Sequence, residues 1–140
     1  MKVGNYMTPE PVTLSENESM GEALMLMRRH NIRHLPVVNG SILVGIVTDR
    51  DLRRASPSLL SGIAEDRYQE VLDGTSVARI MTREPFTVRL DTDLGEAVGL
   101  LVEKKLGSLP VVNGAELVGI FTEVDALRVL LEVLKKIKKE

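Results

Sequence analysis

The stretch LVGIVTDRD, from Leu43 to Asp51, reads as a buried β-strand that ends at a Thr, with an Asp three residues later. A second stretch, LVGIFTEVD, from Leu117 to Asp125, has the same pattern. A shift of 74 residues aligns residues 7–51 with 81–125 without a gap, and 21 of the 45 aligned positions are identical. A doubling of this extent predicts two copies of one structural unit.

Each copy has the pattern of a β-α-β-β-α unit. A short extended piece, PVTL or PFTV, precedes a capping-box pattern, Ser19 with Glu22 or Asp93 with Glu96, and a run of apolar residues at helical spacing. The strands LPVV and LVGI follow, joined at an Asn-Gly pair that is typical of a tight hairpin. One unit of about 50 residues buries too little surface alone, so we expect an α/β fold in which two repeats pack as a pseudo-two-fold pair.

The expected organisation is one paired domain over residues 1–140. Repeat 1 covers 4–54, a linker with a short helix covers 55–77, repeat 2 covers 78–130, and the end of a C-terminal helix covers 131–140. Within the linker, SPSLLSG is typical of a loop and IAEDRYQEVL of a short helix. The C-terminal helix is amphipathic, with an apolar side that is made of Leu127, Leu130, Leu131, Leu134 and Ile137.

Composition excludes several classes of site. The chain has no Cys, so disulfides, thiolate metal sites and cysteine nucleophiles are absent. Its net charge of −2 and its two Tyr, two Phe and no Trp do not favour a nucleic-acid surface. The first residues lack an apolar segment typical of a secretory signal, and no apolar run is long enough to span a membrane. We therefore expect a cytoplasmic protein that is not bound to membranes.

The repeated Thr-x-x-Asp phrase has two physical interpretations. Thr48 and Thr122 lie where a strand ends and a helix begins, so Thr and Asp can simply cap that helix. A helix start also attracts phosphate, and an Asp one turn later can accept hydrogen bonds from both hydroxyls of a ribose. Gly45 and Gly119 within the strands are typical of a close approach by a ligand or by another backbone.

Each repeat resembles a CBS motif, and the pair resembles a CBS domain pair, or Bateman module. The resemblance covers residues 4–130 and is carried by YMTPEPVTL and IMTREPFTV, by IRHLPVVNG and GSLPVVNG, and by GIVTDRD and GIFTEVD. TDRDLRRASPS is also similar to the stand-alone acetoin-utilisation AcuB-like group. The resemblance implies ligand sites in two clefts between the repeats, for AMP, ADP, ATP, S-adenosylmethionine, NAD-type nucleotides or cyclic dinucleotides, with no obligatory cofactor.

By resemblance, the Asp holds ribose hydroxyls, the Thr faces phosphate, and the adenine lies against the first extended piece and the return strand. The implied ligand-binding residues are Val12, Thr13, Ile46, Thr48 and Asp51 in the first copy, and Phe86, Thr87, Ile120, Thr122 and Asp125 in the second. Three basic residues of the first copy, Arg33, His34 and Arg50, occupy positions suited to phosphate, whereas the second copy has Gly107, Ser108 and Val124 there. We expect two sites that do not bind alike.

Other functions find less support in the sequence. His30 and His34 are four residues apart, but Pro36 makes a continuous helix through both unfavourable, so we expect no metal site. No nucleophile elbow, HExxH motif or P-loop is present, so we expect no catalytic residues and no enzyme activity.

The expected function is therefore reversible binding of an adenosine-type ligand, with signalling through a change of conformation or oligomer. The resemblance implies a homodimer. The output would be a change of oligomer or a signal to an effector protein of unknown identity. The alternative is a structural or protein-interaction module with vestigial clefts.

Overall fold

In the computed structural model, which describes residues 1–57, 62 and 64–138, the chain forms two compact α/β units. Unit 1 contains Met1–Pro11 and Phe86–Glu140, and unit 2 contains Val12–Pro85. The α/β class and the two repeats agree with the prediction. The compact units cut across the sequence repeats, because the segment that precedes the first extended piece of each repeat packs with the other copy.

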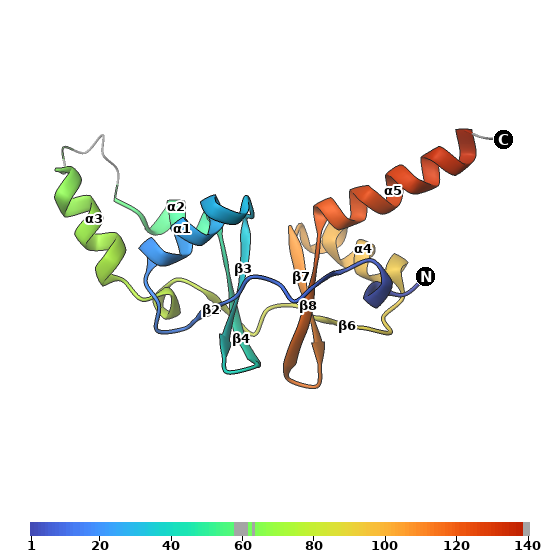
Figure 1. Cartoon of the computed structure of the whole chain (residues 1–140), viewed down its shortest axis with the longest axis horizontal. Helices are drawn as coiled ribbons and strands as arrows, with labels where there is room; N and C mark the ends of the chain where they lie inside the picture. Colours follow the sequence, from blue (N-terminus) through green and yellow to red (C-terminus); the bar gives the residue numbers. More distant parts are fainter. Residues whose placement is uncertain (58–61, 63, 139–140) are drawn as a thin grey trace. The chain divides into compact units, whose positions relative to one another are not determined.

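Unit 2 is a small mixed sheet with helices, in the chain order shown in Figure 1. Strand β2 lies parallel to β3, β3 forms an antiparallel hairpin with β4, and β5 adds antiparallel to β4. The element bounds are β2 Leu14–Ser15, α1 Met20–His30, β3 His34–Asn39, β4 Ile42–Thr48, α2 Asp49–Ala55, α3 Glu65–Gly74, the 3-10 turn Val77–Arg79 and β5 Thr82–Arg83.

Unit 1 repeats this arrangement with the first and last parts of the chain. Strand β6 lies parallel to β7, β7 forms an antiparallel hairpin with β8, and β1 adds antiparallel to β8. The element bounds are the 3-10 turn Val3–Asn5, β1 Thr8–Pro9, β6 Val88–Arg89, α4 Leu94–Lys104, β7 Ser108–Asn113, β8 Glu116–Thr122 and α5 Glu123–Lys138.

Local sequence signals account for the element ends. Gly40 and Gly114 adopt positive φ angles in the two hairpin turns, as the Asn-Gly pairs predict. Ser19 caps α1, its hydroxyl accepting a hydrogen bond from the Glu22 backbone N–H at 3.1 Å. Asp93 also caps its helix, but it accepts from the Gly95 N–H, so the predicted pairing of Asp93 with Glu96 is not the observed cap.

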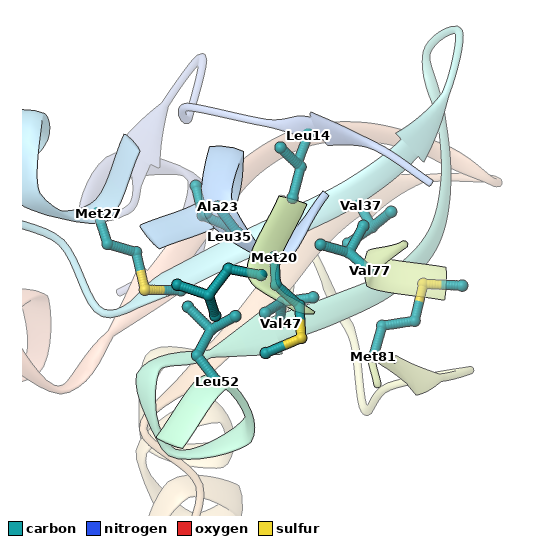
Figure 2. Packing of buried hydrophobic residues seen from close by; sticks show 11 residues of the cluster. Leu14, Met20, Ala23, Met27, Leu35, Val37, Val47, Leu52, Val77 and Met81 are labelled. Carbon is teal, nitrogen blue, oxygen red and sulfur yellow. The ribbon is translucent and has the colours of Figure 1, made fainter. Parts of the chain in front are cut away.

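Each unit has a hydrophobic core between its helices and its sheet. Figure 2 shows the core of unit 2, in which Met20, Met27 and Met81 pack with Leu and Val side chains. The core of unit 1 is built around Phe121, which is fully buried. Met side chains on α1 thus act mainly as core residues, as expected, because an unbranched side chain fills irregular gaps.

The predicted linker helix is confirmed as α3, which packs against α1. Most of the predicted SPSLLSG loop lies outside the described residues. The predicted C-terminal helix is confirmed as α5, whose first turns pack on the core of unit 1 through Ala126 and Val129. Beyond these turns, from Leu130 to Lys138, α5 is exposed along its length and extends past the rest of its unit (Figure 1).

Candidate functional site

The strand-to-helix junction of unit 2 contains Thr48 and Asp51. Thr48 ends β4 and caps α2: its backbone N–H donates to Asp51 Oδ2 at 2.9 Å, and the Asp51 N–H donates to Thr48 Oγ1 at 3.2 Å. The capping interpretation is therefore correct for this pair. Among the described residues, Oδ1 of Asp51 accepts no hydrogen bond, and the Thr48 hydroxyl hydrogen is not donated to a protein group. Both residues are half-buried.

The equivalent junction of unit 1 contains Thr122 and Asp125. The same two cap bonds are present, from the Thr122 N–H to Asp125 Oδ2 at 2.9 Å and from the Asp125 N–H to Thr122 Oγ1 at 3.2 Å. The residue Asp125 is only 3% exposed, in contrast to Asp51. A buried carboxylate requires donors to compensate for its lost hydration, and the structure supplies them.

Three additional donors reach the carboxylate of Asp125. The Thr8 hydroxyl lies 3.1 Å from Oδ1 and 3.3 Å from Oδ2, the Thr122 hydroxyl donates to Oδ2 at 3.1 Å, and Arg128 Nη1 lies 3.4 Å from Oδ1. A carboxylate has about four lone-pair positions. Those of Asp125 are therefore all engaged by the protein itself.

Thr8 reaches Asp125 because β1 lies directly against β8. In this pair Thr8 is opposite Ile120 and Pro9 is opposite Gly119. A Cβ atom at Gly119 would lie 3.0 Å from the Thr8 carbonyl oxygen and in contact with Met7 Sδ. The strand glycine thus permits the approach of another backbone, which was one of its two predicted roles.

Three predicted basic residues gather near the junction of unit 2. The Arg33 carbonyl oxygen accepts a hydrogen bond from the Asp49 N–H at 3.0 Å, and His34 lies opposite Thr48 in the hairpin. Arg50 is exposed on the first turn of α2. This brings Arg33, His34 and Arg50 to the end of β4 where Thr48 and Asp51 lie.

Unit 1 has the same backbone arrangement without the basic side chains. The Gly107 carbonyl oxygen accepts from the Glu123 N–H at 3.0 Å, and Ser108 lies opposite Thr122. Val124 takes the place of Arg50. The two junctions therefore share their geometry and differ in charge.

The remaining predicted residues flank these junctions. Ile46 and Ile120 are buried in β4 and β8, and Val12 and Thr13 immediately precede β2. Phe86 and Thr87 precede β6 in the same way, and the exposed Phe86 ring carries the Lys104 ammonium 5.5 Å from its centroid. We define the Asp51 set as Val12, Thr13, Arg33, His34, Ile46, Thr48, Arg50 and Asp51, all in unit 2, and the Asp125 set as Phe86, Thr87, Ile120, Thr122 and Asp125, all in unit 1.

Thr8 and Arg128 are not among the site residues that the sequence predicts. The identity of Met7-Thr8 with Met81-Thr82 was visible in the repeat, but nothing in the sequence indicated that Thr8 pairs with the distant copy. Within the described residues, Thr82, its counterpart, lies opposite Ile46 and has no hydrogen bond to Asp51. Arg54, the counterpart of Arg128, likewise makes no ion pair with Asp51 there.

Neither a metal cluster nor a membrane helix is found in the described part of the chain. His30 ends α1 whereas His34 begins β3, so they do not share a helical face, and no group of three or more His, Asp or Glu side chains within residues 1–57, 62 and 64–138 is arranged to hold a metal ion. Over the same residues, every helix is too short or too polar to cross a bilayer.

Two equivalent Thr–Asp junctions define a class of proteins that are built from two copies of one repeat. Comparison of the sequence with known families identifies this class. The model of the CBS domain matches residues 3–58 and 77–132. The chain therefore belongs to the CBS domain family. It is 34% identical over 119 residues to the CBS domain-containing protein YhcV of Bacillus subtilis, covering 84% of this chain and 77% of YhcV. It spans only 43% of an uncharacterised 33.4 kDa protein of Thermofilum pendens that is 35% identical over 129 residues.

Solved structures of CBS pairs have the same fold. A crystal structure of an acetoin utilisation protein (AcuB) from Vibrio cholerae has a TM-score of 0.82 and 29% identity, covering 100% of this chain and 97% of that one. CBSX2 in complex with AMP has a TM-score of 0.76 and 32% identity, covering 94% and 97%. The CBS pair of MJ0100, in complex with 5-methylthioadenosine and S-adenosyl-L-methionine, has a TM-score of 0.76 and 28% identity, covering 93% and 99%.

Proposed function

We propose that the chain is a regulatory module, not an enzyme, that reversibly binds an adenosine-type ligand at its Thr–Asp junctions. Binding changes its conformation or its oligomeric state, and an effector protein reads the change. The ligand class is AMP, ADP, ATP or S-adenosylmethionine, because relatives with the same fold hold AMP in one case and methylthioadenosine with S-adenosylmethionine in another. As part of this proposal the module acts in the cytoplasm.

One observation carries the proposal for the Asp51 set. Among the described residues, Oδ1 of Asp51 is an acceptor without a protein donor, and it lies next to the uncommitted Thr48 hydroxyl. A pair of ribose hydroxyls supplies the donors that such a carboxylate lacks. The basic side chains of Arg33 and Arg50 provide charge for a phosphate, in agreement with a phosphorylated adenosine.

Asp51→Asn tests this assignment. An Asn oxygen still accepts from the Thr48 N–H and preserves the cap, but its NH₂ group replaces the acceptor that the ribose needs. Because hydrogen bonds to charged groups contribute about 1.5–3 kcal/mol, we expect AMP binding to weaken by about tenfold to 100-fold. Isothermal titration calorimetry with AMP measures the dissociation constant.

The matched control is Asp49→Asn, which lies on the same turn of α2 but in an ion pair with Arg53 at 3.6 Å. This control should bind AMP like the unmodified chain. Equal AMP affinity for Asp51→Asn and Asp49→Asn would contradict the assignment of Asp51.

We also propose that two copies of the chain pair through α5. Its exposed apolar side is formed by Leu127, Leu130, Leu131, Leu134 and Ile137. An apolar surface of this extent on a small unit is typical of a protein interface. The helix begins with acidic residues and ends with Lys135, Lys136 and Lys138.

An antiparallel arrangement makes α5 complementary to itself. If the two helices cross between Leu130 and Leu131, the acidic Glu123 lies opposite Lys138 of the second copy, and Leu127 lies opposite its Leu134. A two-fold axis repeats each of these contacts, so one surface serves both copies. This charge complementarity favours a second copy over an unrelated partner as the occupant of the α5 face.

A further inference from the structure

We infer that Thr8 and Arg128 withhold Asp125 from ligand and so determine which of the two Thr–Asp junctions binds first. We call these two residues the Asp125 clamp. The inference deepens the proposed function and rests on it, since it concerns the same class of ligand. It assigns a specificity role to two residues that lie outside the predicted site.

A ribose requires an acceptor, and the two junctions differ in the one that they offer. At both junctions the Thr N–H occupies Oδ2 of the Asp, at 2.9 Å in each case. Oδ1 is the atom that distinguishes them. Among the described residues it has no donor at Asp51, whereas at Asp125 it receives Thr8 at 3.1 Å and Arg128 at 3.4 Å.

The Thr hydroxyls of the two junctions also differ. The Thr122 hydroxyl donates to Asp125 Oδ2 at 3.1 Å, so its hydrogen is committed inside the protein. The Thr48 hydroxyl makes no such bond to Asp51 among the described contacts. A ligand at the Asp125 junction must therefore displace protein donors from both side chains, whereas a ligand at Asp51 displaces none of these bonds.

The fold of unit 1 produces the clamp. Thr8 is held against β8 by the β1 pairing, and Arg128 follows Asp125 by one turn of α5. The carboxylate is thereby buried and charge-paired at the same time, with a 4% exposed side chain. Leaving such a group without its donors is costly, so the clamp opens only when a ligand supplies equivalent ones.

The two counterparts provide an internal control for the clamp. Thr82 and Arg54 occupy the equivalent positions in unit 2, and neither contacts Asp51 among the described interactions. Repeat identity at Thr8 and Thr82 therefore does not imply the same contact. The Thr8 hydroxyl donates to Asp125, whereas the Thr82 hydroxyl makes no hydrogen bond to Asp51 among the described interactions.

The experiment opens the clamp in a chain whose first junction has been disabled. Asp51→Asn is compared with Asp51→Asn combined with Thr8→Val and Arg128→Gln, and AMP binding is measured by isothermal titration calorimetry. Val keeps the branched shape of Thr in β1, and Gln keeps much of the length of Arg. Removing both donors leaves Oδ1 of Asp125 without a donor from Thr8 or Arg128, while the Thr122 bonds to Oδ2 remain.

We expect the unmodified chain to bind one AMP tightly and Asp51→Asn to bind weakly. The combined variant should regain binding, at least about tenfold tighter than Asp51→Asn alone, because one charged acceptor becomes available. Thr8→Ser in the same background should retain the clamp and remain weak. Thr82→Val with Arg54→Gln should also remain weak.

The outcomes separate the two proposals. If Asp51→Asn binds AMP as tightly as the unmodified chain and loses it on Asp125→Asn, the clamp does not withhold Asp125 and the inference is wrong, while the binding function stands. If the combined variant gains nothing although circular dichroism shows it folded, the inference is also wrong. If the unmodified chain binds no AMP but the combined variant does, the proposed use of Asp51 fails and the clamp is supported. If neither binds, both proposals are overturned.

Discussion

At Gly119 the missing side chain leaves room for Met7 and Thr8 to lie against β8. Gly45 has the same role in unit 2, where a Cβ atom would lie 2.8 Å from the Thr82 carbonyl oxygen and 2.7 Å from Met81 Sδ. A Met side chain can move away, but a backbone carbonyl in a paired strand moves only with its strand. The two glycines therefore control how closely the short strands β1 and β5 approach.

Ala substitutions at Gly45 and Gly119 test this role. We expect Gly45→Ala and Gly119→Ala each to lower the free energy of unfolding by about 1–3 kcal/mol, as overpacking does in cores. Gly119→Ala should also displace Thr8 and weaken the Asp125 clamp. Urea unfolding followed by circular dichroism measures the first effect.

Gly99 supplies the matched control for this series. It lies in α4, where an added Cβ atom would meet open space, and Ala forms helices better than Gly by about 1 kcal/mol. Gly99→Ala should therefore stabilise the chain. A stability loss at Gly99 equal to that at Gly45 would show that added bulk in general, and not strand approach, causes the effect.

At the scale of elements, most of α5 lacks packing from its own unit. Its first turns are anchored by Ala126 and Val129, while Leu130, Leu134 and Ile137 are at least half exposed. A helix with this pattern gains most of its stability from tertiary packing, and under the proposed pairing that packing comes from α5 of a second copy. Oligomeric state and helix stability should consequently change together.

Leu130→Glu with Leu134→Glu tests the role of this helix. Placing carboxylates in an antiparallel interface buries unpaired charge, so we expect the chain to become monomeric. Analytical ultracentrifugation gives the mass. Val102→Glu, at a residue on α4 that is 73% exposed, is the matched apolar-to-acid control and should leave the mass unchanged. An unmodified chain that sediments as a monomer would contradict the pairing through α5.

Prediction from the sequence succeeded for the elements with local signals. The hairpin of Asn39 and Gly40, the cap of α1 at Ser19 and the helix α3 were all predicted, because turn residues, capping residues and apolar spacing act over a few positions. The two-residue strands β1 and β5 could not be predicted in this way. They are too short for a periodic pattern, and their partners are distant in the chain.

The same reasoning explains what was predictable about the site. Thr48, Asp51, Thr122 and Asp125 were selected by the repeat, and their cap bonds follow from local spacing. The different environments of the two carboxylates were not predictable. They depend on Thr8, which is 117 residues from Asp125, and no local pattern carries that information.

For the whole molecule, ligand binding should appear as added stability. A ligand that binds only the folded chain at one site adds about 2.7 kcal/mol when present at 100 times its dissociation constant. We expect a rise in melting temperature with at least one of AMP, ATP, S-adenosylmethionine, NADH and cyclic di-AMP. Differential scanning fluorimetry provides this measurement.

Asp51→Asn is the control for the panel, since it should respond less to the same ligand at the same concentration. The alternative, a structural or protein-interaction module with unused sites, requires that no member of the panel raises the melting temperature. A rise of equal size in Asp51→Asn would instead indicate binding elsewhere on the chain.

The division of the chain between the two units also has a consequence for its synthesis. Unit 2 is one continuous stretch, Val12–Pro85, whereas unit 1 joins Met1–Pro11 to a segment that begins at Phe86. On the ribosome, unit 2 can complete its core while β8, the partner of β1, has not yet been translated. At about 5–20 residues per second, the N-terminal segment waits several seconds for its partner. The unit that contains Met1–Pro11 is therefore the second of the two to close.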